Sequence, residues 1–282
     1  MKKILILGGS GLVGTALQSV AHLRGYSVVA PGHSEVDLTD PEALDAYITQ
    51  TDADVIINSA AVISIDSLEQ DPIPAWQINT VAAGVIARAA SKRPGSTLIY
   101  LSTQLVFDGT KVFYAESDAT SPTTTYGITK YEGEVLTRHF ATLGHIRHHI
   151  VRTALVYGEK RKTFVDEVAK TLKEGKTFEA ATDQYSNPTR ASDLAEAIFT
   201  HFIDVDADSG VFHLINQTPE RGVSRYEIAQ EIAKIVGASR ALVLEAPGAV
   251  FKAKRPSVSL VNTRLPQLPE WREALRKHLS EK

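Results

Sequence analysis

The chain has 282 residues, with 30 Lys and Arg against 33 Asp and Glu, which gives a formal net charge of −3 at pH 7. This balance excludes the basic footprint of a nucleic-acid-binding protein and the composition of an acidic disordered tail. The absence of cysteine excludes disulfides, zinc–thiolate sites, iron–sulfur clusters and cysteine nucleophiles. No apolar run approaches the ~18–20 residues of a membrane helix, so we expect a cytoplasmic protein without a membrane partner.

The first half of the chain alternates short apolar runs with amphipathic segments. The runs predict buried parallel strands over Ile4–Leu7, Ser27–Ala30, Asp54–Asn58, Thr97–Leu101 and Ile150–Thr153. The segments between them predict helices over Leu12–Arg24, Pro41–Gln50, Ala75–Ser91 and Thr125–Leu143. This β-α repeat predicts an α/β fold with a doubly wound, Rossmann-like parallel sheet.

A glycine-rich segment joins the first predicted strand to the first predicted helix. Gly8 is placed to make the tight turn, Gly11 to let the backbone approach a pyrophosphate, and Gly14 to allow close helix–sheet packing. The N-terminus of the helix then offers N–H groups to phosphates. We interpret the segment as a dinucleotide site, the alternative being a glycine turn without a ligand. Its expected cofactor contacts are Gly8, Ser10, Gly11, Leu12, Val13 and Gly14.

After Tyr157 the alternation of predicted strands and helices is less regular. Helices are predicted over Thr163–Glu174, Ala191–Ile203, Ser224–Val236 and Glu270–Leu279, with a strand over Val211–Ile215 and with Ser224 as an N-cap. We therefore expect two parts in the chain. One is a dinucleotide-binding domain over residues 1–157, to which residues 187–204 return. The other is a smaller substrate-binding lobe made of residues 158–186 and 205–282.

The end of the second predicted strand bears on the choice of dinucleotide. An NAD enzyme usually places an acid there for the ribose 2′-hydroxyl, but this strand runs into Pro31 and Gly32. His33 is placed to approach a 2′-phosphate, and Asp37 with Leu38 to approach the adenine edge. The sequence therefore favours NADP(H) over NAD(H).

A hydroxyl, a phenol and an ammonium are predicted to meet beyond the fourth strand. Ser102 and Thr103 end that strand, while Tyr126 and Lys130, four residues apart, share one face of the next helix. A nearby ammonium stabilises a phenolate, so we expect Lys130 to lower the pKa of Tyr126 from its usual ~10. Tyr126 then protonates a carbonyl oxygen as hydride reaches the carbon, and Thr103 or Ser102 binds the same oxygen. The alternative is a surface tyrosine beside a solvated lysine.

These motifs resemble the extended short-chain dehydrogenase/reductases and, among them, the dTDP-4-dehydrorhamnose reductase family, over nearly the whole chain. The stretches that carry the resemblance are 8–14, 58–61, Asp66 with Glu69, Asn79, 101–109, 126–130, 183–189, 193–195, and Arg255-Pro256 with Ser259. The resemblance implies NAD(P)H-dependent reduction of the 4-keto group of a nucleotide-linked deoxysugar, as in dTDP-rhamnose biosynthesis. It also implies that Thr103, Tyr126 and Lys130 are catalytic, and that the cofactor contacts Ala60, Ala61, Ser102, Tyr126 and Lys130.

The departures from the family pattern all fall on the expected substrate side. Gln104 and Leu105 follow the threonine where the family has Asp and Tyr, and Leu155 stands at the place of a sugar-contacting Trp. Val258 replaces an Asn in the Arg-Pro stretch, whose Arg255 is expected to bind the diphosphate bidentately. We expect the reductase chemistry to be kept and the substrate to contact Gln104, Leu155 and Arg255. The sequence does not identify the sugar.

Two other functions remain open at this point. A nucleotide-sugar dehydratase or epimerase of the same superfamily shares the fold, but a dehydratase needs an acid–base pair where this chain has Gln104 and Leu105. The resemblance also allows a non-catalytic dinucleotide-binding subunit, like the regulatory subunit of methionine adenosyltransferase. A homodimer is compatible with the sequence, which does not determine the oligomeric state.

The remaining charged and aromatic features are interpreted as structural. The run Lys160-Arg161-Lys162 is expected to be a solvated face, the alternative being a role in steering a diphosphate. Trp76 and Trp271 are expected to pack within helices. Three histidines near the fifth strand are interpreted as an exposed polar linker and not as a metal site: His145, His148 and His149.

Overall fold

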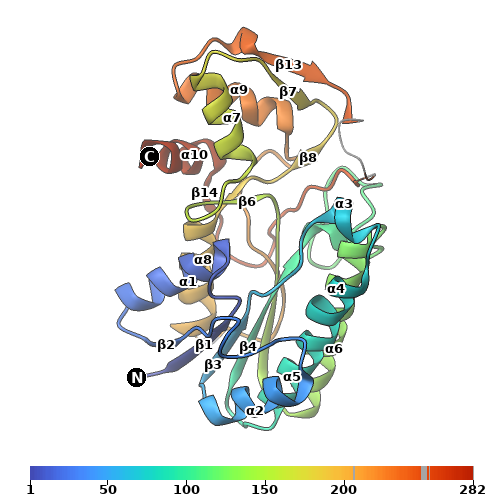
Figure 1. Cartoon of the computed structure of the whole chain (residues 1–282), viewed down its shortest axis with the longest axis vertical. Helices are drawn as coiled ribbons and strands as arrows, with labels where there is room; N and C mark the ends of the chain where they lie inside the picture. Colours follow the sequence, from blue (N-terminus) through green and yellow to red (C-terminus); the bar gives the residue numbers. More distant parts are fainter. Residues whose placement is uncertain (206, 249–252, 254, 282) are drawn as a thin grey trace.

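A six-stranded parallel sheet forms the centre of the computed structural model, which describes residues 1–205, 207–248, 253 and 255–281 (Figure 1). From edge to edge, the strands are β10 (Gly210–His213), β5 (Arg147–Thr153), β4 (Thr97–Thr103), β3 (Val55–Asn58), β1 (Lys3–Leu7) and β2 (Ser27–Val29). The chain order reverses between β1 and β3. The carboxyl ends of these two strands therefore form the switch point at which doubly wound sheets bind their ligands.

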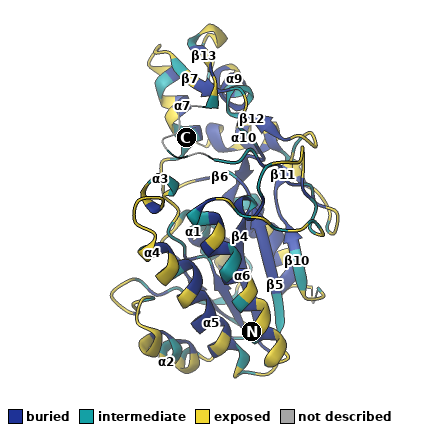
Figure 2. Cartoon of the chain, turned by 90° about the vertical axis from the view of Figure 1, so that its right-hand side faces the viewer, coloured by how far each residue is buried: buried dark blue, intermediate teal, exposed yellow. Residues whose placement is uncertain are grey.

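Helices cover both faces of the sheet (Figure 1). One face carries α1 (Leu12–Leu23) and α8 (Ala191–Ile198), and the other carries α2 (Pro41–Thr51), α5 (Ala83–Ser91) and α6 (Thr125–Leu143). Figure 2 shows that β4 is buried along its length, while the outer side of α2 is exposed. Helix α5 packs between α2 and α6 and is mostly buried. The predicted α/β fold with a doubly wound sheet is confirmed.

Residues Ile4–Leu7 of β1 form an unbroken apolar run because both faces of the strand are buried. Ile4 and Ile6 belong to the core on the side of α1 and α8. Leu5 and Leu7 belong to the core on the side of α2 and α5. Both sets of side chains are excluded from water, so these four positions are all apolar.

A smaller group of elements lies beyond the sheet, at the top of Figure 1. It consists of α7 (Phe164–Lys173), α9 (Arg225–Ile235), α10 (Trp271–Ser280) and the parallel pair of β7 (Phe178–Ala181) and β13 (Val243–Ala246). Ser224 is the N-cap of α9, as predicted, because its hydroxyl accepts a hydrogen bond from the Glu227 N–H. The short elements are α3 (Ile65–Leu68), α4 (Ile73–Ala75), η2 (Gln104–Val106), β6 (Val156–Tyr157), β8 (Tyr185–Ser186), β9 (Thr189–Arg190), β11 (Asn216–Gln217), β12 (Val223–Ser224), η4 (Arg240–Leu242) and β14 (Leu268–Glu270).

The helix predicted over Ala75–Ser91 is present, but its first half is not α-helical. A π-helical segment, η1 (Trp76–Ala82), separates α4 from α5. Its wider turn brings Asn79 toward α6, where the amide nitrogen donates to the Thr129 hydroxyl over 3.2 Å and to the Val62 carbonyl over 3.1 Å. The predicted helix over Ala191–Ile203 also ends in a π-helical segment, η3 (Phe199–Ile203).

Two predictions about aromatic side chains are corrected by the structure. Trp271 is buried as expected, but Trp76 is 41% exposed and lies on the outer side of η1. His149 does not belong to an exposed linker: it is fully buried in β5 and stacks on Phe202, with 4.4 Å between ring centroids. No helix in the described part of the chain is long and apolar enough to cross a membrane.

Candidate active site

Most of the predicted site residues line two neighbouring cavities at the carboxyl ends of the central strands. The cavities share Gly11, Ser59 and Ala61 in their linings. The first cavity, of about 210 Å³, is lined by several predicted cofactor contacts: Gly8, Ser10, Gly11, His33, Leu38, Ala60 and Ala61. The second, of about 400 Å³, is called the cleft below, and its lining includes Leu12, Val13, Ser102, Thr103, Gln104, Tyr126, Lys130 and Leu155.

Three of the four glycines in residues 8–14 differ in the space that surrounds them. Gly8 has a φ of +81°, and a Cβ on it would lie 2.6 Å from the Ala60 nitrogen. A Cβ on Gly14 would lie 2.2 Å from the Gly8 carbonyl oxygen, so the start of α1 contacts the loop directly. A Cβ on Gly11 would meet only the Gly8 oxygen, at 3.2 Å, and Gly11 lines both cavities. Its missing side chain leaves space for a phosphate close to the backbone.

The start of α1 has the properties of an anion site. Gly11 is the N-cap and has no side chain that could cap the helix. The first turn of the helix contains no acidic residue. The first N–H groups and the positive end of the helix dipole are therefore available to an anion. Together with the cradle around Gly11, this arrangement fits the pyrophosphate of a dinucleotide.

The adenine side of the first cavity agrees only partly with the sequence prediction. His33 and Leu38 line the cavity. Asp37 is exposed and does not line it, because its carboxylate accepts hydrogen bonds from the N–H and the hydroxyl of Thr39, over 2.8 and 2.7 Å. A cofactor contact from Asp37 therefore stays a prediction that this geometry does not support.

Tyr126, Lys130 and Thr103 come together in the cleft from two elements. Tyr126 and Lys130 lie one turn apart on α6, whose N-cap, Thr124, accepts a hydrogen bond from the Gly127 N–H. Thr103 ends β4, where its hydroxyl accepts a hydrogen bond from the Leu105 N–H over 3.2 Å, and it lines the same cleft as Tyr126. A Cβ on Gly127 would lie only 2.1 Å from the Leu105 carbonyl oxygen, so the start of α6 packs directly against the segment that follows β4.

The pKa of Tyr126 differs from the sequence prediction. Burial raises the pKa of Tyr126 to about 12, and the neighbouring Thr103 hydroxyl only partly opposes this. Burial lowers the pKa of Lys130 to about 7, against the attraction of Glu134. The expectation that Lys130 lowers the pKa of Tyr126 is therefore wrong for the protein alone, because removal from water dominates. At neutral pH the phenol keeps its proton and is a donor.

Residues predicted on the substrate side lie in different places. Gln104 and Leu155 line the cleft; the Gln104 side-chain oxygen accepts a hydrogen bond from the Ser186 hydroxyl over 2.9 Å, and Leu155 has a φ of +39°. Such a φ is strained for a branched residue and is typical of functional sites. Arg255 does not line the cleft, and its Nη2 lies 2.8 Å from the Asp66 carboxylate on α3.

Sequence reasoning missed Arg225, which lines the cleft. It begins α9, and its guanidinium lies over the Phe164 ring, 4.6 Å from the centroid. Burial and the neighbouring Arg255 lower the pKa of Arg225 to about 10, so it is still charged at neutral pH. Nothing in the spacing of the sequence marks it, because the Ser224 capping box before it is a common start of a helix.

The comparisons with known proteins agree with this geometry. Residues 1–282 match the family model described as the RmlD substrate binding domain. The chain belongs to this family. A probable dTDP-4,6-dihydroxy-2-methyloxan-3-one 4-ketoreductase of Streptomyces antibioticus is 31% identical, over 96% of this chain and 92% of that protein. The dTDP-4-dehydrorhamnose reductase of Salmonella typhimurium is 31% identical, over 99% and 97%.

A solved structure supports the same relationship. The crystal structure of dTDP-4-dehydrorhamnose reductase from Bacillus anthracis, in complex with NADP, matches this chain with a TM-score of 0.90. The two sequences are 27% identical, and the match covers 100% of both chains. The family resemblance inferred from the sequence motifs is confirmed.

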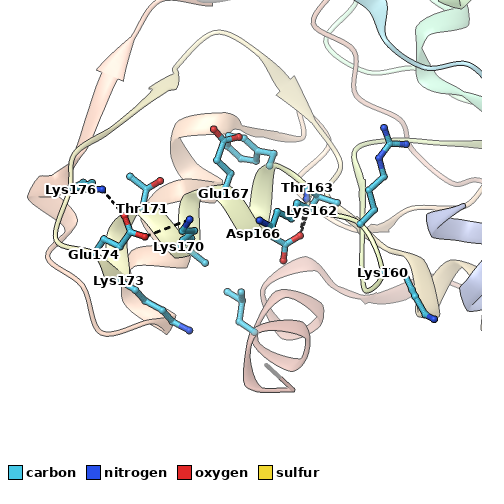
Figure 3. A pocket seen from close by; sticks show the side chains of 14 residues that line it. Lys160, Lys162, Thr163, Asp166, Glu167, Lys170, Thr171, Lys173, Glu174 and Lys176 are labelled. Carbon is cyan, nitrogen blue, oxygen red and sulfur yellow. Dashed lines mark hydrogen bonds and ion pairs between the residues drawn. The ribbon is translucent and has the colours of Figure 1, made fainter.

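The basic run at residues 160–162 divides between two surfaces. Arg161 lines the cleft. The whole run also borders an outer hollow of about 1020 Å³ beside α7, where Lys160 and Lys162 are labelled in Figure 3. In this hollow Lys170 and Lys176 both pair with Glu174, at 3.7 and 2.8 Å (Figure 3). Carboxylates offset these cations, as on a solvated face, so we assign no site to the outer hollow.

Proposed function

We propose that this protein reduces the 4-keto group of a nucleotide-linked 6-deoxysugar. The observation that carries the proposal is the convergence of Tyr126, Thr103 and Lys130 in a cleft that adjoins the glycine loop. The Streptomyces antibioticus and Salmonella typhimurium relatives support it, because both are named as reductases of dTDP-linked keto sugars. The chemistry needs one hydride and one proton.

The glycine loop and the end of β4 are the proposed cofactor site. The first turn of α1 binds the pyrophosphate, and Ala60, Ala61 and Ser102 line the path toward the cleft. A bound reduced nicotinamide dinucleotide supplies the hydride. The proposed contacts along this path are Gly8, Ser10, Gly11, Leu12, Val13, Gly14, Ala60, Ala61, Ser102, Tyr126 and Lys130.

Tyr126 is the proposed proton donor. Its phenol is protonated at neutral pH because burial raises its pKa to about 12, so it can donate to the carbonyl oxygen as that oxygen gains charge. The Thr103 hydroxyl donates to the same oxygen. The Lys130 ammonium, on the same helix face, stabilises the phenolate that proton transfer leaves behind.

NADPH is the proposed form of the cofactor. None of the described residues that line the first cavity carries a carboxylate, which a ribose 2′-hydroxyl usually requires. His33, which is exposed at that cavity, is the proposed neighbour of a 2′-phosphate. The measurement that decides this is the ratio of kcat/KM values for NADPH and NADH; a ratio below one would contradict the proposal.

The nucleotide sugar is proposed to bind between the sheet and the lobe around α7, α9 and α10. Strand β10, which was expected in the lobe over residues 205–282, belongs to the central sheet instead. Gln104 and Leu155 contact the sugar, because both line the cleft that contains Tyr126. Arg225 and Arg161 are the proposed diphosphate ligands from the lobe. Arg255 joins them if it exchanges its Asp66 partner for the diphosphate.

A second copy of the chain is the proposed protein partner. Four apolar side chains are exposed on three neighbouring elements: Ile73 on α4, Trp76 on η1, and Ile128 and Val135 on α6. The three elements pack against one another. A homodimer through this surface removes them from water. The molar mass in solution tests this, with Val135→Glu expected to give a monomer.

The activity itself is tested with purified protein, NADPH and dTDP-linked 4-keto-6-deoxysugars. We expect loss of the nicotinamide absorbance that depends on the ketosugar, and a product with a new hydroxyl at C4 by NMR. The same assay without sugar is the control. No turnover with any nucleotide ketosugar would refute the proposed function.

A further inference from the structure

The helix face that carries Tyr126 and Lys130 also carries a buried acid one turn further along α6. Glu134 is fully buried, and its partner Arg152, on β5, is 3% exposed. Arg152 Nε donates to Glu134 Oε1 over 2.9 Å, and Nη2 donates to Oε2 over 2.7 Å. The Ser102 hydroxyl, at the end of β4, donates to the same Oε1. One carboxylate therefore connects α6, β4 and β5 directly behind the cleft.

Lys130 forms no ion pair with a carboxylate within the described residues. It is 2% exposed, and its ammonium lies 4.0 Å from the centroid of the Tyr100 ring. The titratable groups that face it are Tyr100 on β4 and Tyr126 and Glu134 on α6, with Arg152 on β5 behind Glu134.

Two other titratable groups near Lys130 and the Glu134–Arg152 pair are neutral at pH 7. His213 on β10, which lies beyond Arg152 with Glu116 as its neighbour, is neutral at pH 7 because burial lowers its pKa to about 4. The pKa of Tyr100 is raised by burial, so its hydroxyl is neutral as well. Glu134 is therefore the nearby source of negative charge for the Lys130 ammonium.

We propose that Glu134 and Arg152 are positioning residues, which fix the catalytic face of α6 against the end of β4 and set the negative charge that the buried Lys130 ammonium experiences. This inference rests on the proposed function, because that function gives Lys130 its role. The carboxylate favours the charged form of Lys130, and the guanidinium limits this effect by offsetting the carboxylate. A buried ion pair contributes little net stability compared with apolar residues, so its stabilising effect alone does not account for it.

Two substitutions separate this role from a purely structural one, because their effects have opposite signs. Glu134→Gln removes the charge and keeps an oxygen that accepts from Ser102, so we expect the pKa of Lys130 to fall by about one unit, a tenfold change in the proton equilibrium. Arg152→Gln leaves the carboxylate less neutralised, so we expect the pKa of Lys130 to rise. If the pair only stabilised the fold, the two substitutions would not shift the pKa of Lys130 in opposite directions.

The measurement is an NMR titration of ¹³Cε-labelled lysine in the ligand-free protein, with the Lys130 signal assigned by its loss in Lys130→Met. The pH profile of kcat is recorded in parallel. If Glu134→Gln does not fold, the double variant Glu134→Gln with Arg152→Gln carries the test, since it buries no unpaired charge. We expect its Lys130 midpoint to lie below that of the wild type.

The outcomes separate the inference from the function on which it rests. Equal Lys130 midpoints in the wild type and in all folded variants would overturn the inference. Midpoints that move in the expected directions support it. If they move while the kcat profile does not, the pair acts on Lys130 as proposed, and the catalytic role of Lys130 is refuted.

Discussion

Replacing Lys130 with methionine is expected to stabilise the fold while it impairs the enzyme. Lys130 is 2% exposed, and burial lowers the pKa of its ammonium to about 7 from an ordinary value of 10.5. The folded protein therefore prefers the neutral amine, whereas the unfolded chain keeps the proton up to its ordinary pKa. At about 1.4 kcal/mol for each pKa unit, the difference corresponds to a cost of roughly 5 kcal/mol at low pH. Methionine fills a similar volume without this cost.

The stabilisation by Lys130→Met is expected to depend on pH. The cost is fully present below pH 7, decreases as the pH rises between the folded and unfolded values, and is absent above the unfolded value. We expect Lys130→Met to raise the free energy of unfolding by about 3–5 kcal/mol at pH 6 and by clearly less at pH 9. Urea unfolding at the two pH values measures this. Lys173→Met, at an exposed position of α7, is the control and should change little. A Lys130→Met variant that is no more stable at pH 6 than at pH 9, relative to wild type, would refute the reasoning.

The other predictions concern the start of α6, the substrate oxygen and the diphosphate. Gly127→Ala places a Cβ 2.1 Å from the Leu105 carbonyl oxygen, so chemical unfolding should show a loss of about 1–3 kcal/mol. Gly32→Ala, whose Cβ meets no atom closer than 3.7 Å, should be nearly neutral, and equal losses would contradict the close packing. Thr103→Val should lower kcat roughly tenfold in stopped-flow assays by removing one hydrogen bond to the substrate oxygen, with an unchanged Kd for NADPH. Arg225→Gln should raise KM for the nucleotide sugar by about 10- to 100-fold, whereas an unchanged KM would place the diphosphate elsewhere.

Parts of the fold were predictable because one local rule decides them. The part of β1 that is buried on both faces, Ile4–Leu7, is apolar at every position, which is the pattern from which the strand was predicted. The π-helical segment at Trp76–Ala82 was not predictable, because it depends on tertiary contacts of Asn79 with Val62 and Thr129. Intrinsic helix preference does not contain this information.

The candidate active site was also predictable only in part. The spacing of Tyr126 and Lys130 placed both on one helix face, and the parallel topology brought Thr103 to them. The pKa order of Tyr126 and Lys130 was not predictable, because it depends on how completely each group is removed from water. Arg225 was missed because only the packing of the lobe brings the start of α9 to the cleft.

The rate of Tyr126→Phe, measured by stopped-flow oxidation of NADPH with a dTDP-linked 4-keto-6-deoxysugar, tests the proposed reductase chemistry most directly. The substitution keeps the ring and removes only the hydroxyl that donates the proton. We expect the rate to fall by about 10²–10⁴-fold, the usual contribution of general acid catalysis, while the Kd for NADPH stays nearly unchanged. A variant that retains most of the wild-type rate would contradict the assignment of Tyr126 as the proton donor.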